Sequence, residues 1–464
     1  MLRFHNTFKR GKEEFRPPDP GKVGIYTCGP TVHDYAHIGN FRAYVWEDLL
    51  CRYLRYSGYR VTQIMNITDV DDKTIRKAGA EGCSLKEFTE RYTRAFFEDL
   101  DTLGLRKAEH YPRATDHIPE MVRLVQTLTE RGFTYSGQGS IYYRIAKFPD
   151  YGKLARLRPE ELRSTGRAES DEYDKQDVRD FALWKKTREG EPSWKTEIGV
   201  GRPGWHLECS AMSMHYLGES FDLHTGGVDN IFPHHENEIA QSEGATGKQF
   251  VRYWLHCAHL MVNGEKMSKS LGNFFTLRDL LDRQQDPMAI RYLLLSQHYR
   301  KPLNFTLEGI RWAAGNLVRL EDFRRRISSE PAEPGSQSAL KAAIREAAEK
   351  FHAALDDDLN TSAALAAVFD LIRVANTACD QGGLREDDRR GILDLLNAVE
   401  EIFGIPLART EPEAEAEILS LIEERTRARK AGDFRRADEI RDTLAERGIV
   451  LEDTPGGVRW KRPR

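Results

Sequence analysis

Residues 23–40 read VGIYTCGPTVHDYAHIGN. Their apolar start, residues 23–28, predicts a short strand that ends at Gly29-Pro30, because proline cannot donate to a strand ladder. A helical pattern follows from about Phe41 to Ser57, and a second strand is expected from Tyr59 to Ile67. Strand, helix and strand in this order predict a parallel sheet, with a ligand site outside the carboxyl ends of its strands.

The same alternation returns after a long insertion. Helices are expected at residues 205–216 and near 234–243, and strands at 221–224 and around 253–261. We therefore expect an α/β fold in which a Rossmann-type parallel sheet is split into two halves. The insertion between the halves carries several Gly and Pro turn signals, and its roughly 85 residues are too few for most elaborate domains.

The second half of the chain has a helical pattern. Helices are expected at residues 307–327, 339–355, 362–379, 414–431 and 434–447, followed by a small hairpin around Pro455-Gly456-Gly457. At 464 residues the chain should hold several domains. The expected units are the two halves of the sheet domain (1–114 and 201–262), the insertion (115–200), a connecting region (263–310), a helical bundle (311–405) and a separate α+β module (411–464).

Composition indicates a globular protein of the cytoplasm. The chain is 40% hydrophobic and 31% charged, and its first ten residues have no apolar stretch behind them that could form a secretory signal. No segment reaches the roughly 18 to 20 uninterrupted apolar residues that a membrane span requires. Six cysteines without tight spacing indicate free thiols, available as metal ligands or nucleophiles, rather than disulfides.

The formal charge of −4 argues neither for nor against nucleic-acid binding, because local distribution matters more than the sum. Residues 421–464 hold 12 Lys and Arg against 9 Asp and Glu, a net of +3. Arg425, Arg427, Arg429 and Lys430 would give phosphate contacts if they share a face of their helix. A solvated helix surface is the commoner reading of such a charge run.

Two polar segments could handle phosphate. His37, Gly39 and Asn40 stand at the mouth of a helix amino terminus, where unpaired N–H groups and the positive dipole end favour an anion. An ordinary capped connection explains the same residues. Lys266 and Lys269, in the loop KMSKS, could stabilise the charge on departing pyrophosphate, although a solvated charged loop explains the same residues when the loop is taken alone.

Four potential metal ligands lie at the ends of elements in the expected sheet. Cys28 ends the first strand, and Cys209 lies on the helix that opens the second half. His234 and Glu238 are four apart on a later helix, so their side chains project from one face. Together they form a credible zinc set, although each alone has a simpler explanation as a buried thiol or a surface pair.

The sequence around these residues resembles one family closely. The matching segments are GWHLECS at 204–210, DLHTGGVDNIFPHHENE at 222–238, NITDVDDK at 66–73 and CGPT at 28–31. With the His37–Asn40 and Lys266–Ser270 segments, which match the paired signatures of class I aminoacyl-tRNA synthetases, they resemble the cysteinyl-tRNA synthetase family over essentially the whole chain. The usual His-Ile-Gly-His form is altered at Asn40, whose amide donates hydrogen bonds but cannot become cationic.

The resemblance implies ATP-dependent ligation of L-cysteine to cysteine tRNA through a cysteinyl adenylate, with Mg²⁺ accompanying ATP. It implies one zinc ion per chain, held by Cys28, Cys209, His234 and Glu238, which distinguishes the thiol of cysteine from the hydroxyl of serine. So selective a site would not require an editing domain, and the insertion is too short to be a convincing one. The resemblance also makes residues 263–310 a loop and stem-contact region, and we expect a monomer with no membrane partner.

Single residues receive roles from the same resemblance. The catalytic group is His37, Asn40, Lys266 and Lys269; the substrate-binding group is Thr68, Trp205, His224 and Asp229; and the RNA-binding group is Arg429, Asp438, Asp453 and Trp460. A core aromatic is an equal reading of Trp205. No role is assigned to His33, His206 or His235.

Two other functions stay open at this point. One is the related ligase that joins cysteine to an amino sugar in mycothiol synthesis, which has no anticodon module. The other is a catalytically silent RNA-binding relative. The roughly 60 residues after the bundle argue against the first, and the complete lysine loop and metal set argue against the second.

Overall fold

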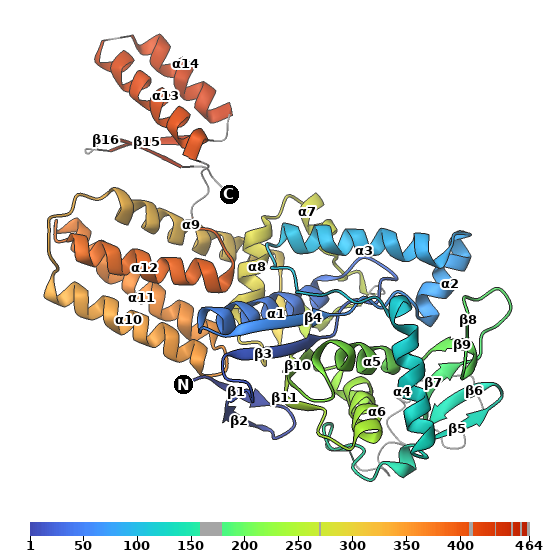
Figure 1. The fold of residues 1–464 in the computed structure, drawn as a ribbon. Helices are drawn as coiled ribbons and strands as arrows, with labels where there is room; N and C mark the ends of the chain where they lie inside the picture. Colours follow the sequence, from blue (N-terminus) through green and yellow to red (C-terminus); the bar gives the residue numbers. More distant parts are fainter. Residues whose placement is uncertain are drawn as a thin grey trace.

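The structure is a computed structural model, and it describes residues 1–157, 179–268, 271–407, 412–431, 433–446, 449–454 and 457–461. Figure 1 shows a sheet domain, a helical bundle beside it and a small unit at the carboxyl terminus. The insertion lies at the far side of the sheet domain from the bundle.

The central sheet is parallel, as the sequence predicts, with strand order β11-β10-β3-β4. Its strands are β3 (Lys22–Thr27), β4 (Arg60–Met65), β10 (Phe221–Gly227) and β11 (Val251–Cys257). The helices around it are α1 (Ile38–Tyr56), α5 (Trp205–Leu217) and α6 (Glu236–Thr246). Residues from the two halves of the chain therefore meet at one carboxyl edge, across the pairing of β3 with β10.

Both faces of the sheet are covered. Val23 and Ile25 of β3 pack into a hydrophobic cluster with α1, whereas Tyr26 packs into a second cluster with residues of α5 and α6. Successive side chains of a strand point to opposite faces, so a strand buried on both faces needs apolar residues at nearly every position. In β3, Val23 and Ile25 serve one face and Tyr26 serves the other.

Two sequence expectations near the sheet are corrected. The strand expected around 253–261 ends at Cys257, and β12 (Leu260–Val262) belongs to a different small sheet with β13 (Glu265–Lys266) and β14 (Leu303–Phe305). His234 does not lie on α6 itself but in a single turn before it, residues Ile231–His235. Phe232 is extended there and Pro233 has no N–H group, so a regular helix cannot begin earlier.

The insertion contains an antiparallel sheet that the sequence did not predict. Its order is β5-β6-β7-β9-β8, and its strands are β5 (Thr134–Gly137), β6 (Ser140–Tyr143), β7 (Phe181–Lys185), β8 (Trp194–Thr196) and β9 (Gly199–Pro203). Strands this short carry too little periodicity to be recognised. Helices α2 (Asp72–Glu81), α3 (Leu85–Thr102) and α4 (Ile118–Glu130) were also not predicted.

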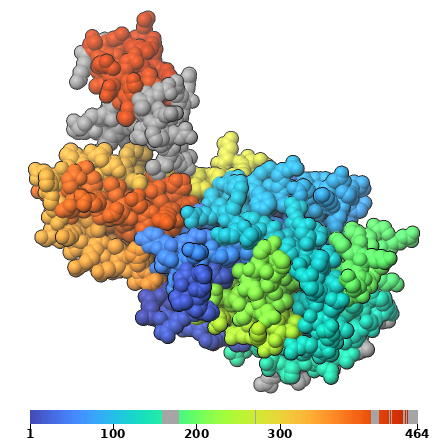
Figure 2. Space-filling view, viewed as in Figure 1, coloured from blue at the N-terminus to red at the C-terminus, as the bar shows by residue number. Residues whose placement is uncertain are grey.

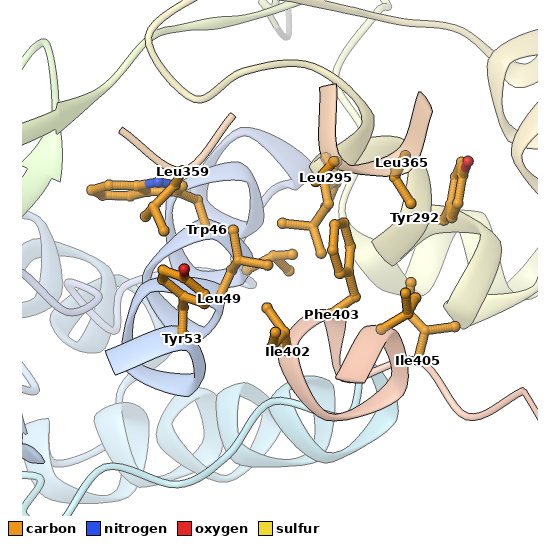
Figure 3. Close-up of a cluster of buried hydrophobic side chains, with 14 of the residues drawn as sticks. Trp46, Leu49, Tyr53, Tyr292, Leu295, Leu359, Leu365, Ile402, Phe403 and Ile405 are labelled. Carbon is orange, nitrogen blue, oxygen red and sulfur yellow. The ribbon is translucent and has the colours of Figure 1, made fainter. Parts of the chain in front are cut away.

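The bundle packs directly against α1. It comprises α9 (Leu307–Ser329), α10 (Ser338–Asp356) and α11 (Thr361–Asp380), in agreement with the predicted helices, and α12 (Glu386–Phe403), which was not predicted. The short helices α7 (Leu277–Asp282) and α8 (Pro287–Ser296) precede the bundle. Figure 3 shows Trp46 and Leu49 of α1 in the same buried cluster as Leu295 of α8 and Phe403 of α12. The bundle therefore buries one side of α1, the helix that begins at Ile38.

One helix, α11, would be long and apolar enough to cross a membrane by length and composition alone. Half of its apolar window is buried, and it packs against α10 and α8, which is the arrangement of a core helix. It is therefore weak evidence for a membrane span.

The carboxyl-terminal unit has its own core. Helices α13 (Pro412–Lys430) and α14 (Phe434–Glu446) precede a hairpin of β15 (Val450–Thr454) and β16 (Gly457–Lys461), as predicted. Ile418, Ile422, Ile440, Leu444 and Ile449 form a hydrophobic cluster distinct from the two larger ones. Figure 2 shows this unit as a separate lobe.

Candidate active site

Several polar residues follow the carboxyl ends of the parallel strands. Cys28 comes directly after β3, Asn66 and Thr68 follow β4, and Asp229 follows β10. Because neighbouring parallel strands end at the same edge, these residues border one site. The amino termini of α1 and α5 open toward the same edge of the sheet.

A tight group of potential metal ligands lies at this edge. One ligand atom from each of Cys28, His234, His235 and Glu238 lies within 4.8 Å of the others. Sγ of Cys28 is 3.2 Å from Nε2 of His235, and Nε2 of His234 is 3.1 Å from Oε1 of Glu238. The three residues from the second half of the chain are buried, and Cys28 is partly buried.

Cys209, on α5, lies beside this group rather than within its closest contacts. It is buried, and its thiol is in hydrogen-bonding contact with that of Cys28. The structure therefore groups three of the four predicted zinc ligands, places Cys209 beside them, and adds His235, which has no predicted role. The adjacent His234-His235 pair was the only signal for it, and two neighbouring residues seldom point into one site.

The electrostatics of the group suit a cation. Burial lowers the pKa of His234 to about 3, although Glu238 opposes the change, and burial holds the pKa of His235 well below its usual range. Neutral imidazole is the form that binds metal. The hydrogen bond with Cys209, and then burial, raises the pKa of Cys28 well above its usual range.

Glu238 gives a further reason to expect a cation. Its side chain is fully buried, and the 3.1 Å contact of Oε1 with Nε2 of His234 lacks hydrogen-bond geometry, so among the described residues Oε1 has no hydrogen-bond partner. A positive ion would satisfy that oxygen and would favour the thiolate forms of the cysteines. Two thiols, an imidazole and a carboxylate are a donor set that fits zinc.

Further histidines hold the ligand side chains in place. His224 Nε2 lies 2.9 Å from Oε2 of Glu238, and His206 Nδ1 lies 2.9 Å from Nδ1 of His234. His235 Nδ1 is 2.8 Å from Nε2 of His256, whose Nδ1 is 2.8 Å from Oγ1 of Thr7. Metal-binding side chains in proteins are commonly oriented by such outer hydrogen bonds.

The proposed pocket residues surround the same group. The ring of Trp205 stacks on that of His234, with centroids 4.3 Å apart and an interplanar angle of 28°. Trp205 is only partly buried, so it is not an ordinary core aromatic. Thr68 is buried between the segments that carry the two cysteines, and its hydroxyl donates to Oε2 of Glu208 at 2.9 Å. Burial raises the pKa of Glu208 well above its usual range, and the bond from Thr68 opposes that change.

The segment predicted to handle phosphate caps α1. His37 is the N-cap residue, and it exchanges hydrogen bonds with Asn40. The ring of His37 packs edge-on against Phe274, with centroids 5.3 Å apart. A Cβ added at Gly39 would lie 3.2 Å from Cε of Met267, so the lysine loop lies against the helix terminus.

Of the two lysines of the loop, the first lies within the described residues. Lys266 is exposed at the end of β13. Lys269 lies outside the described residues. The loop therefore begins beside the cap of α1, as the pairing of the two motifs predicts.

The four RNA candidates all lie in the carboxyl-terminal unit. Arg429 on α13 and Asp438 on α14 are exposed, Asp453 lies in β15, and Trp460 lies in β16 opposite Leu451. The basic residues of α13 do not share one face, because Arg425 is only 6% exposed whereas Arg427 and Arg429 are exposed.

Comparisons with known proteins agree over the whole chain. Residues 14–315 match the family described as tRNA synthetases class I (C) catalytic domain, residues 350–408 match the DALR domain, and residues 411–460 match the cysteinyl-tRNA ligase anticodon binding domain. The chain is 50% identical over 463 residues to the cysteine–tRNA ligase of Solibacter usitatus, covering 99% of both proteins. It is 49% identical to those of Brachyspira hyodysenteriae and Chlamydia muridarum, again with 99% of each chain covered.

Solved structures with lower identity share the fold. Mycobacterium tuberculosis methionyl-tRNA synthetase, in complex with methionyl-adenylate, superposes with a TM-score of 0.60 at 18% identity, covering 83% of this chain and 90% of that one. The Agrobacterium radiobacter LeuRS–tRNA–LeuAMS ternary complex gives a TM-score of 0.60 at 13% identity, covering 86% and 87%.

Proposed function

Since this chain belongs to the cysteine–tRNA ligase family of class I tRNA synthetases, we propose that the ligand group around Glu238 selects the thiol of its amino-acid substrate. The enzyme ligates cysteine to its tRNA at the expense of ATP, by way of cysteinyl adenylate. The observation that carries the proposal is the convergence of Cys28, His234 and Glu238 beside the capped amino terminus of α1.

Cys28, Cys209, His234 and Glu238 would hold one zinc ion per chain. Bound there, zinc supplies a preference for sulfur over oxygen, which separates cysteine from serine where shape alone discriminates weakly. His235 supports this set, because its second ring nitrogen is held by His256. Trp205 and Thr68 would form the walls of the pocket, and Asp229 would bind the nucleoside.

The activation step needs positioned charge rather than a covalent enzyme intermediate. The carboxylate of cysteine attacks the α-phosphate of Mg-ATP, and pyrophosphate leaves. His37 and Asn40 would bind the phosphates at the positive end of α1, while Lys266 and Lys269 would stabilise the departing pyrophosphate. A ribose hydroxyl at the 3′ end of the tRNA then attacks the anhydride and releases AMP.

The carboxyl-terminal unit would recognise the anticodon through Arg429, Asp438, Asp453 and Trp460. Unpaired bases are read by stacking and by hydrogen bonds to their edges, for which arginine, aspartate and tryptophan are suited. The match of residues 411–460 to an anticodon-binding family disfavours the mycothiol-type ligase. We further propose that the enzyme acts as a cytoplasmic monomer.

Cysteine-dependent exchange of pyrophosphate into ATP tests the proposal, with serine as the control and bound zinc quantified on the same protein. We expect exchange with cysteine that depends on the metal, and none with serine at the same concentration. Full activity without bound zinc, or equal exchange with serine, would refute thiol selection by this site.

A further inference from the structure

The segment that carries two of the metal ligands starts a helix whose first residue caps nothing. His234 lies in the single turn before α6, and Glu238 lies in the first turn of α6. The side chain of His235, the N-cap residue, accepts no hydrogen bond from the described N–H groups of that turn. Its ring nitrogens face Cys28 and His256 instead. Because a side-chain cap is what usually fixes the start of a helix, the angle between the two ligands depends on contacts from elsewhere in the chain.

The insertion supplies such contacts to Glu236, the first residue of α6. Oε1 of Glu236 accepts a hydrogen bond from the N–H of Gly152 at 2.9 Å. Oε2 accepts two more, from the N–H of Leu154 at 3.0 Å and from that of Ala155 at 2.8 Å. The side chain of Glu236 is fully buried. An acceptor with three backbone donors is fixed in position, because a shift would leave several buried polar groups unpaired at once.

The same loop also holds the second residue of α6. The hydroxyl of Tyr151 donates to Oδ1 of Asn237, and both side chains are buried. Near the other end of the helix, Lys153 forms an ion pair with Glu243. Helix α4 of the insertion packs beside α6 as well (Figure 1). The insertion therefore contacts α6 along its length, and four hydrogen bonds are made to its first two residues.

These contacts can move one ligand relative to the other. Each residue of an α-helix turns by about 100°, so Glu236 projects roughly 200° round the helix from Glu238 and does not compete for its place in the metal group. His234 is held separately, by the stacked ring of Trp205 and by His206. A rotation of the first turn of α6 would therefore change the distance between Glu238 and His234.

We propose that Glu236 and Asn237 are positioning residues of the metal group, held in place by the loop at residues 151–155 of the insertion. The insertion then has a role of its own in amino-acid selection, because it sets the position of Glu238 and thereby the affinity of the site for zinc. This inference rests on the proposed function, since it assumes that the ligand group binds zinc.

Zinc affinity measures this role without reference to catalysis. Glu236→Gln turns one of the two acceptors into a donor that faces an N–H group of the loop. Tyr151→Phe removes only the hydroxyl that donates to Asn237. For both variants we expect the dissociation constant for Zn²⁺, measured by competition with a chelator, to rise about tenfold. The visible absorption of cobalt(II) bound in place of zinc should also change, because it reports the arrangement of the ligands.

Tyr143→Phe is the matched control. The hydroxyl of Tyr143 donates to the carbonyl oxygen of Ala240 at 2.8 Å, so the same substitution removes one buried bond between the insertion and α6, beyond the turn that carries Glu238. We expect Tyr143→Phe to lose about as much thermal stability as Tyr151→Phe, with a zinc constant within about twofold of the unaltered protein and the same cobalt spectrum.

Pyrophosphate exchange gives a second readout on the same samples. In Tyr151→Phe, KM for cysteine should rise about tenfold while KM for ATP stays within about twofold, because only the metal group is displaced. Tyr143→Phe should change neither constant by more than about twofold. Tyr151→Phe carries the test if Glu236→Gln does not fold.

An equal loss of zinc affinity in Tyr143→Phe would overturn the inference, because the effect would then be one of general stability. Unchanged zinc constants and cobalt spectra in both Glu236→Gln and Tyr151→Phe would overturn it too. Absence of bound zinc or of cysteine-dependent exchange in the unaltered protein is a different result, which would refute the proposed function itself.

Discussion

The backbone N–H of Asn40 donates a hydrogen bond to Nδ1 of His37 at 3.1 Å, and the side-chain oxygen of Asn40 accepts one from the N–H of His37 at 3.1 Å. A neutral imidazole whose Nδ1 accepts carries its hydrogen on Nε2. The side-chain oxygen of Asn40 is used in the cap, so under the proposed function its NH₂ group would be the donor for phosphate. Asparagine thus keeps a donor at the position where the motif usually has histidine.

Asn40→Asp tests that division of roles. Aspartate can still cap α1 through an oxygen, so the melting temperature should change little. It replaces a donor by a negative charge, so kcat/KM for ATP should fall by about 10²-fold or more. Pyrophosphate exchange and thermal unfolding are measured on the same samples. Loss of the cap would instead lower the melting temperature, and Asn40→Ala should show that effect.

Gly39→Ala should damage the same site by crowding. A Cβ at Gly39 would lie 3.0 Å from Nδ1 of His37 and 3.2 Å from Cε of Met267, so the ring or the loop must move. We expect kcat for exchange to fall by about tenfold or more. Gly315→Ala in α9 is the matched control, because nothing lies within 4 Å of its Cβ. That control should keep full activity and gain about 0.5–1 kcal/mol of stability.

Cys209→Ser should separate metal binding from RNA binding. Loss of a soft ligand should lower bound zinc and raise KM for cysteine about tenfold or more, while affinity for tRNA stays nearly unchanged. Cys379→Ser, a buried thiol of the bundle, is the control and should retain zinc. Loss of both zinc and tRNA binding in Cys209→Ser would instead mean that this residue is needed chiefly for folding.

Glu47 predicts a pH dependence of stability. It is buried on α1, and burial raises its pKa from 4.5 to about 8. Because the pKa is higher in the folded than in the unfolded protein, the associated stability is present below pH 4.5 and is lost as the pH rises through about 8. Between pH 5 and pH 8.5, Glu47→Gln should gain about 2–4 kcal/mol relative to the unaltered protein in urea unfolding. Parallel curves for the two proteins would contradict this assignment.

Removal of the carboxyl-terminal unit should affect only the second step. The unit has its own hydrophobic cluster, and the site residues for activation all lie before residue 270. A protein ending at residue 407 should keep cysteine-dependent exchange within about twofold and lose tRNA charging by about 10²-fold or more. Aminoacylation and exchange measured side by side check this. Loss of exchange as well would mean that the unit supports the catalytic domain.

The sequence could predict those parts of the site that depend on the periodicity of apolar residues in strands and helices and on short motifs. The strand at residues 23–28 and the helix after it gave the parallel sheet, and the sheet gave the edge at which Cys28 and Glu238 would meet. The short strands of the insertion could not be predicted, because three to five residues of an antiparallel sheet carry little pattern. Periodic patterns of apolar residues predict that a helix or strand exists better than they predict where it ends. The start of α6 is an example, because the helix expected near residue 234 begins at Glu236.

By itself, the sequence determined the fold class, the family and the chemical kinds of ligand gathered at the sheet edge. Only the tertiary structure decided that His235 joins the ligand group, that Asn40 caps α1 and that the Thr68 hydroxyl points to Glu208. Thr68 and Glu208 are 140 residues apart, and the direction of their hydrogen bond depends on Asn66, whose own amide is oriented by the N–H of Gly29 after β3. Such a contact is set by how the sheet and α5 pack together, a relation that no local pattern of residues contains.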